Sequence, residues 1–153
     1  MEFFRKDKNM NIDDMLKLEN QLCFPLYACS REITKAYTPL LSELNLTYTQ
    51  YLVMMVLWEE RHLSVKEICN KLYLDSGTLT PLLKKLEAKE LVTRKRDPED
   101  ERSVIISLTE NGQALREKAK SVPVNMAAQV EMTEEEFKVM HRLLYRIINK
   151  LHD

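Results

Sequence analysis

The feature that most constrains the fold is a series of helix-start signals in the middle of the chain. The tetrapeptides Thr47–Gln50 and Ser64–Glu67 have the form of capping boxes, and each precedes an apolar stretch. Asp75 and Ser76 can cap a third helix over residues 77–89, whose leucines recur at helical spacing. The middle of the chain is therefore predicted to form short helices joined by tight turns.

The pattern changes from helix to strand after residue 90. Residues 91–96 and 103–108 are rich in Val, Ile and Thr, which favours strands, and the charged segment 97–102 is a turn between them. This is the only β-hairpin that the sequence predicts. Two short helices joined by residues 73–76 and followed by a hairpin predict a winged helix-turn-helix.

Apolar residues recur at helical spacing on both sides of this segment. Residues 16–41 carry such a pattern, in which Pro25 predicts a kink or a helix start near Cys23. A helix is also expected from Thr109 to Val122, ended by Pro123, and another from the capping box Thr133–Glu136 to Leu151. The predicted fold class is mainly α with a small β-hairpin.

The length of 153 residues favours a single-domain chain. Within it we assign residues 46–108 to the winged helix-turn-helix. A single such module contacts few phosphates of a nucleic acid, so specific binding usually needs two half-sites. The remaining segments, 12–45 and 109–153, are rich in Leu, Ile, Met, Phe and Tyr, and predict the helical dimerisation part of an intertwined homodimer. Alternatively, these apolar stripes close the core of each monomer.

Composition argues against several classes of protein. The chain has only two glycines, Gly77 and Gly112, whereas a Rossmann or P-loop phosphate site needs glycines at close fixed spacing. The longest apolar run, Tyr51–Trp58, is too short to span a bilayer, and the charged N-terminal segment has no signal-peptide core. Three cysteines without framework spacing fit a reduced, cytoplasmic setting.

Charge is distributed unevenly along the chain. The formal net charge is −1, yet residues 64–96 carry eight basic and four acidic side chains, a local net charge of +4. A basic middle between acidic flanks indicates an anionic partner, although a charge run alone is also typical of a solvated helix face. The hairpin and the basic segment together favour double-stranded DNA as that partner.

The side chains of this segment suit DNA. The face of helix 77–89 opposite its leucines carries hydroxyls that can reach base edges and, one turn later, lysines that suit phosphates. An arginine at the hairpin tip can enter a narrow minor groove, and Asp100 can orient the Arg102 guanidinium. The candidate DNA-binding residues are Lys66, Ser76, Thr78, Thr80, Pro81, Lys84, Lys85, Arg94, Arg96, Asp100 and Arg102.

Among the cysteines, Cys23 has the neighbour most suggestive of chemistry. Tyr27 lies four residues further on, on the same helical face, and a phenol that donates to sulfur stabilises the thiolate that peroxides oxidise. Cys29 lies on a different face, and Cys69 is expected to be a small buried hydrophobic residue. From spacing alone, a merely buried Cys23 is the alternative.

Three motifs of the chain are specific enough to compare with a known family. They are LENQLC followed by Tyr27, LDSGTLTP and DERS, within a similar stretch from about residue 18 to 118. These motifs resemble the MarR family, and within it the organic-hydroperoxide-sensing (OhrR-like) repressors of the one-cysteine type. The resemblance implies a peroxide-sensing Cys23, bonded by Tyr27 and Tyr37 from two subunits.

The resemblance also implies a recognition helix over Ser76–Glu87, a minor-groove contact from Arg102 and a mechanism. The reduced dimer would bind a pseudo-palindromic operator and repress a peroxidase gene until a hydroperoxide converts Cys23 to sulfenic acid and the reading heads lose their spacing. With no cysteine after Cys69, a low-molecular-weight thiol would form the mixed disulfide. Pro25 departs from the family pattern, where an ordinary apolar residue is usual.

Other functions are compatible with parts of the pattern. Within the same fold, the chain could be a redox or virulence global regulator, or a repressor relieved by a phenolic ligand in the dimer crevice. A thiol peroxidase would need a resolving cysteine or a general acid, and the sequence offers neither. We expect no enzyme activity, cofactor or metal, because His62, His141 and His152 have no ligand spacing.

Overall fold

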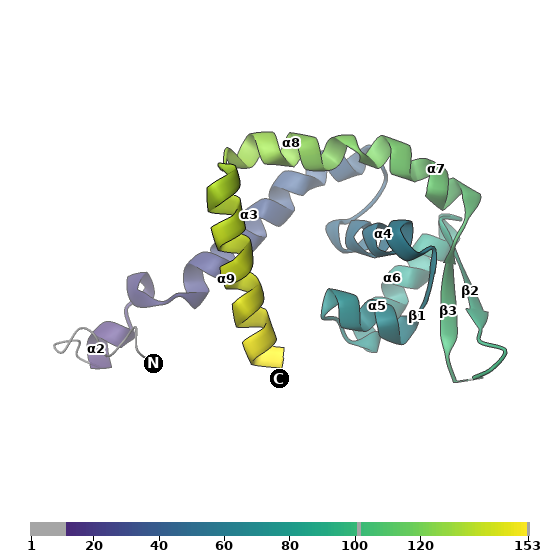
Figure 1. Ribbon diagram of the computed structural model, residues 1–153, viewed down its shortest axis with the longest axis horizontal. Coiled ribbons are helices and arrows are strands. Elements are labelled where there is room, and N and C mark those ends of the chain that lie inside the picture. The colour runs from purple at the N-terminus through teal and green to yellow at the C-terminus, as the bar shows by residue number, and fades with distance from the viewer. Residues whose placement is uncertain (1–11, 101, 153) are drawn as a thin grey trace.

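A computed structural model describes residues 12–100 and 102–152 of the chain, which are mostly helical with one small antiparallel sheet (Figure 1). The elements are α2 (Ile12–Met15), the 3-10 helix η1 (Leu18–Asn20), α3 (Cys23–Ser42), α4 (Tyr48–Glu60), β1 (His62–Ser64), α5 (Val65–Leu72), α6 (Ser76–Ala88), β2 (Val92–Arg96), β3 (Val104–Leu108), α7 (Glu110–Ala119), α8 (Ser121–Val130) and α9 (Glu134–His152). The charged N-terminal segment 1–10 and Glu101 of the predicted turn lie outside the described residues.

The central helices begin where the sequence predicts. Both capping boxes are formed: the Thr47 and Ser64 side chains each accept from the backbone N–H three residues on, and their own backbone N–H groups donate to the Gln50 and Glu67 side chains. Asp75 caps α6 by accepting from the Thr78 backbone N–H at 2.8 Å. These starts are predictable because the first N–H groups of each helix are satisfied by side chains adjacent in sequence.

The sheet contains one strand more than the predicted hairpin. β2 and β3 pair as expected, with Arg94 opposite Ile106, but β1 also pairs with β3, so that β3 lies in the middle. The sequence analysis missed β1 because three residues are too few to show an alternating pattern, and because Ser64 ends the strand while also capping α5. The short strand ties the helix-turn-helix to the wing.

Two prolines mark helix starts. α3 begins at Cys23, so that Pro25 lies in its first turn, where no intrahelical N–H bond is needed. The prediction that Pro123 ends a helix is wrong, because α7 ends at Ala119 and Pro123 lies in the first turn of α8. Lys120 between them keeps right-handed helical geometry, so α7 and α8 run as one arch across the top of the view in Figure 1.

The hydrophobic core lies mainly within and around the winged helix-turn-helix. Its largest fully buried apolar side chains come from α3, α4, α5, α6, α8 and the sheet: Leu41, Val53, Met54, Leu57, Ile68, Leu79, Leu83, Leu86, Val92, Ile106 and Val122. α9, in contrast, has no buried residue. The winged helix-turn-helix is therefore packed by its own side chains together with Leu41 of α3 and Val122 of α8.

Gly112 allows α7 to pack closely on this core. A Cβ at this position would lie 2.1 Å from the Leu91 carbonyl oxygen, so only glycine fits. The Gly112 carbonyl in turn accepts a hydrogen bond of 2.9 Å from Trp58 Nε1 of α4. In the part of the chain that the structure describes, no helix is both long and apolar enough to cross a membrane.

Candidate nucleic-acid interface and cysteine site

Helix α6 has the two faces that the sequence predicts. Leu79, Leu83 and Leu86 are buried in the core. The opposite side is formed by candidate DNA-binding residues, all exposed except the half-buried Thr80: Ser76, Thr78, Thr80, Pro81, Lys84 and Lys85. A solvent-facing row of hydroxyls and lysines on a rigidly packed helix is the arrangement that enters a DNA major groove.

The hydroxyls at the start of α6 are already oriented by the chain. Thr78 Oγ1 donates to Asp75 Oδ2 at 2.7 Å, and Thr80 Oγ1 donates to the Ser76 carbonyl at 2.6 Å. The hydrogen bonds from the Thr78 side chain and backbone lower the pKa of Asp75. Because both threonine protons are used locally, the two oxygens face outward as acceptors for donors such as base amino groups.

One arginine of the wing, Arg94, is held in an ion pair with α6. Arg94 Nη1 lies 3.5 Å from Glu87 Oε2 of α6, and the Arg94 side chain is only 23% exposed. Arg94 therefore ties the wing to the recognition helix, which differs from the predicted role of a direct DNA contact. Besides Lys84 and Lys85 of α6, the exposed basic side chains that phosphates or grooves could meet include Lys66 of α5, Lys95 and Arg96 of β2, and Arg102.

The turn at the wing tip is closed by Asp100. Its Oδ1 accepts from the Arg102 backbone N–H at 3.0 Å, and its carbonyl accepts from the Ser103 N–H at 2.8 Å. Asp100 thus orients Arg102 through the backbone, whereas the sequence suggested a bond to the guanidinium. The Arg102 side chain stays exposed at the tip of the wing.

Cys23 is the first residue of the 20-residue helix α3, and its side chain is exposed. Tyr27 does not bond to Cys23 within the described chain: its hydroxyl accepts from Arg31 Nη1 at 3.2 Å. The sulfur is therefore accessible, and its predicted tyrosine contact is not made in the single chain.

Tyr37 lies too far along α3 to reach Cys23 of the same chain. Fourteen residues of helix separate them, which is roughly 21 Å. Tyr37 instead packs against Tyr48 and Tyr51 of α4, with ring centroids 4.8 and 6.0 Å away, and burial raises the pKa of all three phenols. The sequence analysis missed Tyr48 and Tyr51, although their spacing directly after a capping box places both in the first turn of α4.

The other two cysteines differ from each other. Cys29 is exposed on α3. Cys69 packs against the core but stays half-buried, so the predicted full burial is not reached. Burial is nevertheless the main cause that raises the pKa of the Cys69 thiol. A thiol that stays protonated is a poor nucleophile, so both the raised pKa and the partial burial of Cys69 disfavour a reaction with peroxide.

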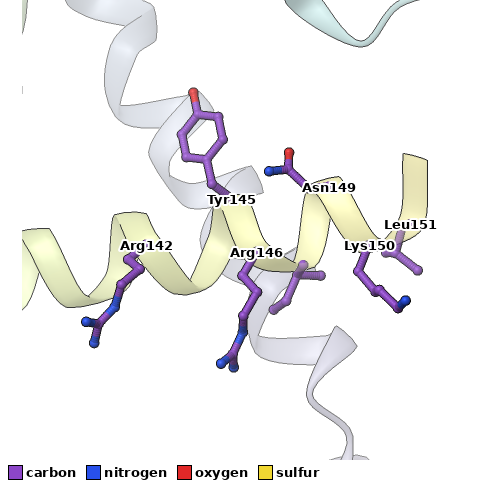
Figure 2. Close-up of a pocket in the computed structure, with 7 residues that line it drawn as sticks. Arg142, Tyr145, Arg146, Asn149, Lys150 and Leu151 are labelled. Carbon is purple, nitrogen blue, oxygen red and sulfur yellow. The ribbon is translucent and has the colours of Figure 1, made fainter. Parts of the chain in front are cut away.

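The two ends of the chain leave apolar side chains uncovered. A cavity of about 590 Å³ lies between Leu22, which directly precedes α3, Leu26 of its first turn, and residues of α9, among them Met140. A second hollow, of about 830 Å³, is lined by residues of α9 alone; Figure 2 shows Arg142 and Arg146 on one side of that helix and Tyr145 on the other. Exposed apolar side chains beside open hollows are typical of a surface that a partner covers.

The described residues hold no cluster of three or more His, Cys, Asp or Glu side chains that could bind a metal ion. What the geometry offers is an exposed cationic reading surface on α5, α6 and the wing, and an exposed thiol at the start of α3. An exposed recognition helix beside a β wing defines the class of winged helix-turn-helix proteins.

Comparison with known proteins identifies the family. The profile described as transcriptional regulator SarA/Rot matches residues 35–119. The organic hydroperoxide resistance transcriptional regulator of Bacillus subtilis is 54% identical over 139 residues, which cover 91% of this chain and 95% of that protein. The transcriptional regulator SarZ of Staphylococcus aureus is 42% identical, over 89% of this chain and 92% of its own length.

A solved structure agrees with these relatives. Reduced AbfR bound to DNA superposes with a TM-score of 0.74 at 35% identity, covering 92% of this chain and 99% of AbfR, a protein of Staphylococcus epidermidis. The chain belongs to the MarR-type family of winged-helix transcriptional regulators, in the branch that includes SarA/Rot and the organic hydroperoxide resistance regulator. The resemblance predicted from the motifs is confirmed, and these relatives are regulators rather than enzymes.

Proposed function

We propose that the protein is a DNA-binding transcriptional repressor that releases its operator when an organic hydroperoxide oxidises Cys23. The observation that carries the proposal is the exposed Cys23 thiol at the first residue of α3, in a chain 54% identical to an organic hydroperoxide resistance regulator. Oxidative chemistry needs an accessible sulfur, and of the three cysteines Cys23 combines exposure with a helix N-terminus.

In this proposal α6 lies in the major groove and the wing reaches the adjacent minor groove. Ser76, Thr78 and Thr80 approach base edges from the N-terminal turn of α6, where the helix dipole also favours phosphate. Lys84 and Lys85 lie further along the exposed face and neutralise phosphates, as does Lys66 from α5. The remaining residues of the candidate interface are Pro81, Arg94, Arg96, Asp100 and Arg102, with Arg94 acting through Glu87.

The functional unit in this proposal is a homodimer. Residues 46–108 form the reading head, and residues 12–45 and 109–153 form the dimerisation part, where the apolar cavities are incomplete in one chain. The 21 Å separation along α3, roughly 1.5 Å per residue, excludes a Cys23–Tyr37 bond within a protomer. A Tyr37 from the second protomer, together with Tyr27 of the first, would then bond the thiolate.

The redox step uses the hydroperoxide as oxidant. The Cys23 thiolate attacks the distal peroxide oxygen, the O–O bond breaks, and the alkoxide leaves as an alcohol after it takes a proton from water. Sulfur is oxidised to sulfenic acid while the peroxide is reduced. A low-molecular-weight thiol then condenses with the sulfenic acid, releasing water and leaving a mixed disulfide. This chemistry fits a cytoplasmic protein, whose thiols are kept reduced until stress.

A second candidate is a repressor relieved by a small phenolic ligand. A cavity of about 660 Å³ between α3, α8 and α9 favours it, because Tyr37 and His141 line a mostly apolar space at whose edge Thr133 and Glu134 also lie. Such a protein would release DNA without any change at Cys23. A broader redox or virulence regulon, in line with SarZ and SarA/Rot as relatives, concerns the genes controlled and not the chemistry.

The test is a gel-shift titration on the DNA upstream of the gene, with and without cumene hydroperoxide, followed by intact-mass measurement. We expect the wild type to bind, to release on peroxide and to gain mass at Cys23. The Cys23→Ser variant should bind equally well and stay bound, while Cys29→Ser serves as the matched control and should behave like the wild type. Release of Cys23→Ser at the wild-type dose would refute the assignment.

A further inference from the structure

We infer that Lys89 is a positioning residue that couples the cysteine-bearing end of the molecule to the recognition helix. The inference rests on the proposed function, because it concerns how oxidation at Cys23 changes the placement of α6. Lys89 was not among the residues that the sequence singled out. Its role comes from contacts with residues far away in sequence.

Lys89 is the residue at which α6 ends. Its Nζ donates to the Asn45 carbonyl and, at 3.1 Å, to Gln50 Oε1. The two acceptors lie at the junction of α3 and α4, where Asn45 belongs to the connection and Gln50 is the third residue of α4. The end of the recognition helix is thus joined by a charged group to the point where the cysteine-bearing helix stops and the next helix begins.

Both acceptors are held in place by the surrounding structure. Gln50 is 1% exposed and is the one buried polar side chain in the part of the chain that the structure describes. Its Oε1 also accepts from the Thr47 backbone N–H at 3.1 Å, as half of the capping box of α4. Asn45 follows the last turn of α3 with a left-handed φ of 53°, and a cation beside a carbonyl at the end of a helix is favoured by the helix dipole.

The tyrosine cluster of Tyr37, Tyr48 and Tyr51 lies beside this contact. Tyr48 lies between Thr47 and Gln50, and its ring contacts Tyr37 of α3 at 4.8 Å. In the proposed mechanism, a displacement of Tyr37 on oxidation would be passed through this ring contact to the first turn of α4, which holds the Gln50 oxygen. The leucines that bury α6 pack without a strong directional preference, whereas the Lys89 hydrogen bonds fix one end of the helix to that turn.

The experiment compares operator affinity before and after oxidation. For each variant, the dissociation constant of the dimer oxidised at Cys23, checked by intact mass, is divided by that of the reduced dimer. We expect Lys89→Met to lower this ratio about tenfold relative to the wild type. Lys89→Arg keeps a cation that can donate to both oxygens and should restore the ratio. Lys118→Met, which removes an exposed lysine from the end of α7, is the matched control and should keep it.

A merely structural role would lower the melting temperature and weaken both affinities equally, leaving the ratio unchanged, and that result overturns the inference. If Lys89→Met does not fold, Lys89→Gln decides, because its uncharged amide can reach at most one oxygen; a wild-type ratio in that variant also overturns the inference. If the wild type itself binds equally before and after oxidation of Cys23, the proposed function fails as well. If the wild type and Lys89→Met release DNA equally on oxidation, the coupling through Lys89 is refuted and the proposed function stands.

Discussion

The reading head, residues 46–108, and the two ends of the chain use their apolar side chains differently. The leucines of α6 are fully buried by neighbours from the same chain. The apolar residues of α9 and of the start of α3 remain largely exposed, and the hollows beside them are open. In the proposed dimer, the head is therefore completed within one chain, whereas the ends supply the surface that meets the second chain.

The largest effect should come from the core of the head. Leu83 is 1% exposed, so Leu83→Ala leaves a cavity and should cost about 2–5 kcal/mol of the free energy of unfolding. Leu151→Ala, at an 82% exposed position of α9, is the matched control and should change stability by less than about 0.5 kcal/mol in the monomer. Urea unfolding of both variants measures the difference, and equal losses would break the comparison.

A charge on the exposed face of α9 should act on assembly. Met140 is 46% exposed and borders two of the open cavities, so Met140→Asp should weaken dimerisation by about 2 kcal/mol or more, the value of one buried apolar side chain. Met55→Asp is the control, because Met55 of α4 is 41% exposed but belongs to the head. Sedimentation equilibrium gives the dimer dissociation constant of both variants. If only Met55→Asp weakened the dimer, the assignment of the two regions would be reversed.

The wing arginine should affect DNA and not assembly. Arg102→Ala should weaken operator binding by about 1–3 kcal/mol and reduce the salt dependence of the dissociation constant by about one ion. The control, Arg142→Ala on α9, removes the same side chain outside the head. An unchanged affinity of Arg102→Ala would mean that the wing tip does not reach the DNA.

The smallest effect concerns the cap of α6. Hydrogen bonds from Thr78 lower the pKa of Asp75 in the folded chain, so the cap contributes fully above the ordinary aspartate pKa, about 3.9, and is lost as the pH falls through the lowered value. Asp75→Asn keeps an acceptor but does not titrate. Its melting temperature should fall less steeply between pH 5 and 3, each about one unit from that pKa. Parallel curves for both proteins would contradict the assignment.

Local signals made the helices of the head predictable from the sequence. The caps at Thr47, Ser64 and Asp75 join residues only three positions apart, so the pattern and the contact coincide. Contacts between residues far apart in the sequence have no comparable local pattern. The short strand β1 is defined by its pairing with β3. The hydrogen bond from Lys89 to Gln50 joins residues 39 positions apart, and no local sequence pattern indicates it.

The candidate site was predicted unevenly for the same reason. The exposed face of α6 follows from helical spacing, but the pairing of Arg94 with Glu87 depends on how the wing folds back. The spacing that suggested a Cys23–Tyr27 contact gave the right face of α3, yet Arg31 occupies the Tyr27 hydroxyl in one chain. If the second chain supplies Tyr37, as proposed, the periodicity of one chain cannot reveal the whole site.

The bond between Trp58 and Gly112 gives the molecule an intrinsic fluorophore at a useful place. Trp58 is the chain's sole tryptophan; its indole donates to a backbone carbonyl of α7, and its ring lies 6.1 Å from Tyr51 of the aromatic cluster. The emission maximum and quenching of this indole depend on that hydrogen bond and on those neighbours. Stopped-flow emission after mixing with peroxide can therefore follow, in real time and without a label, how quickly a change at the start of α3 reaches the head.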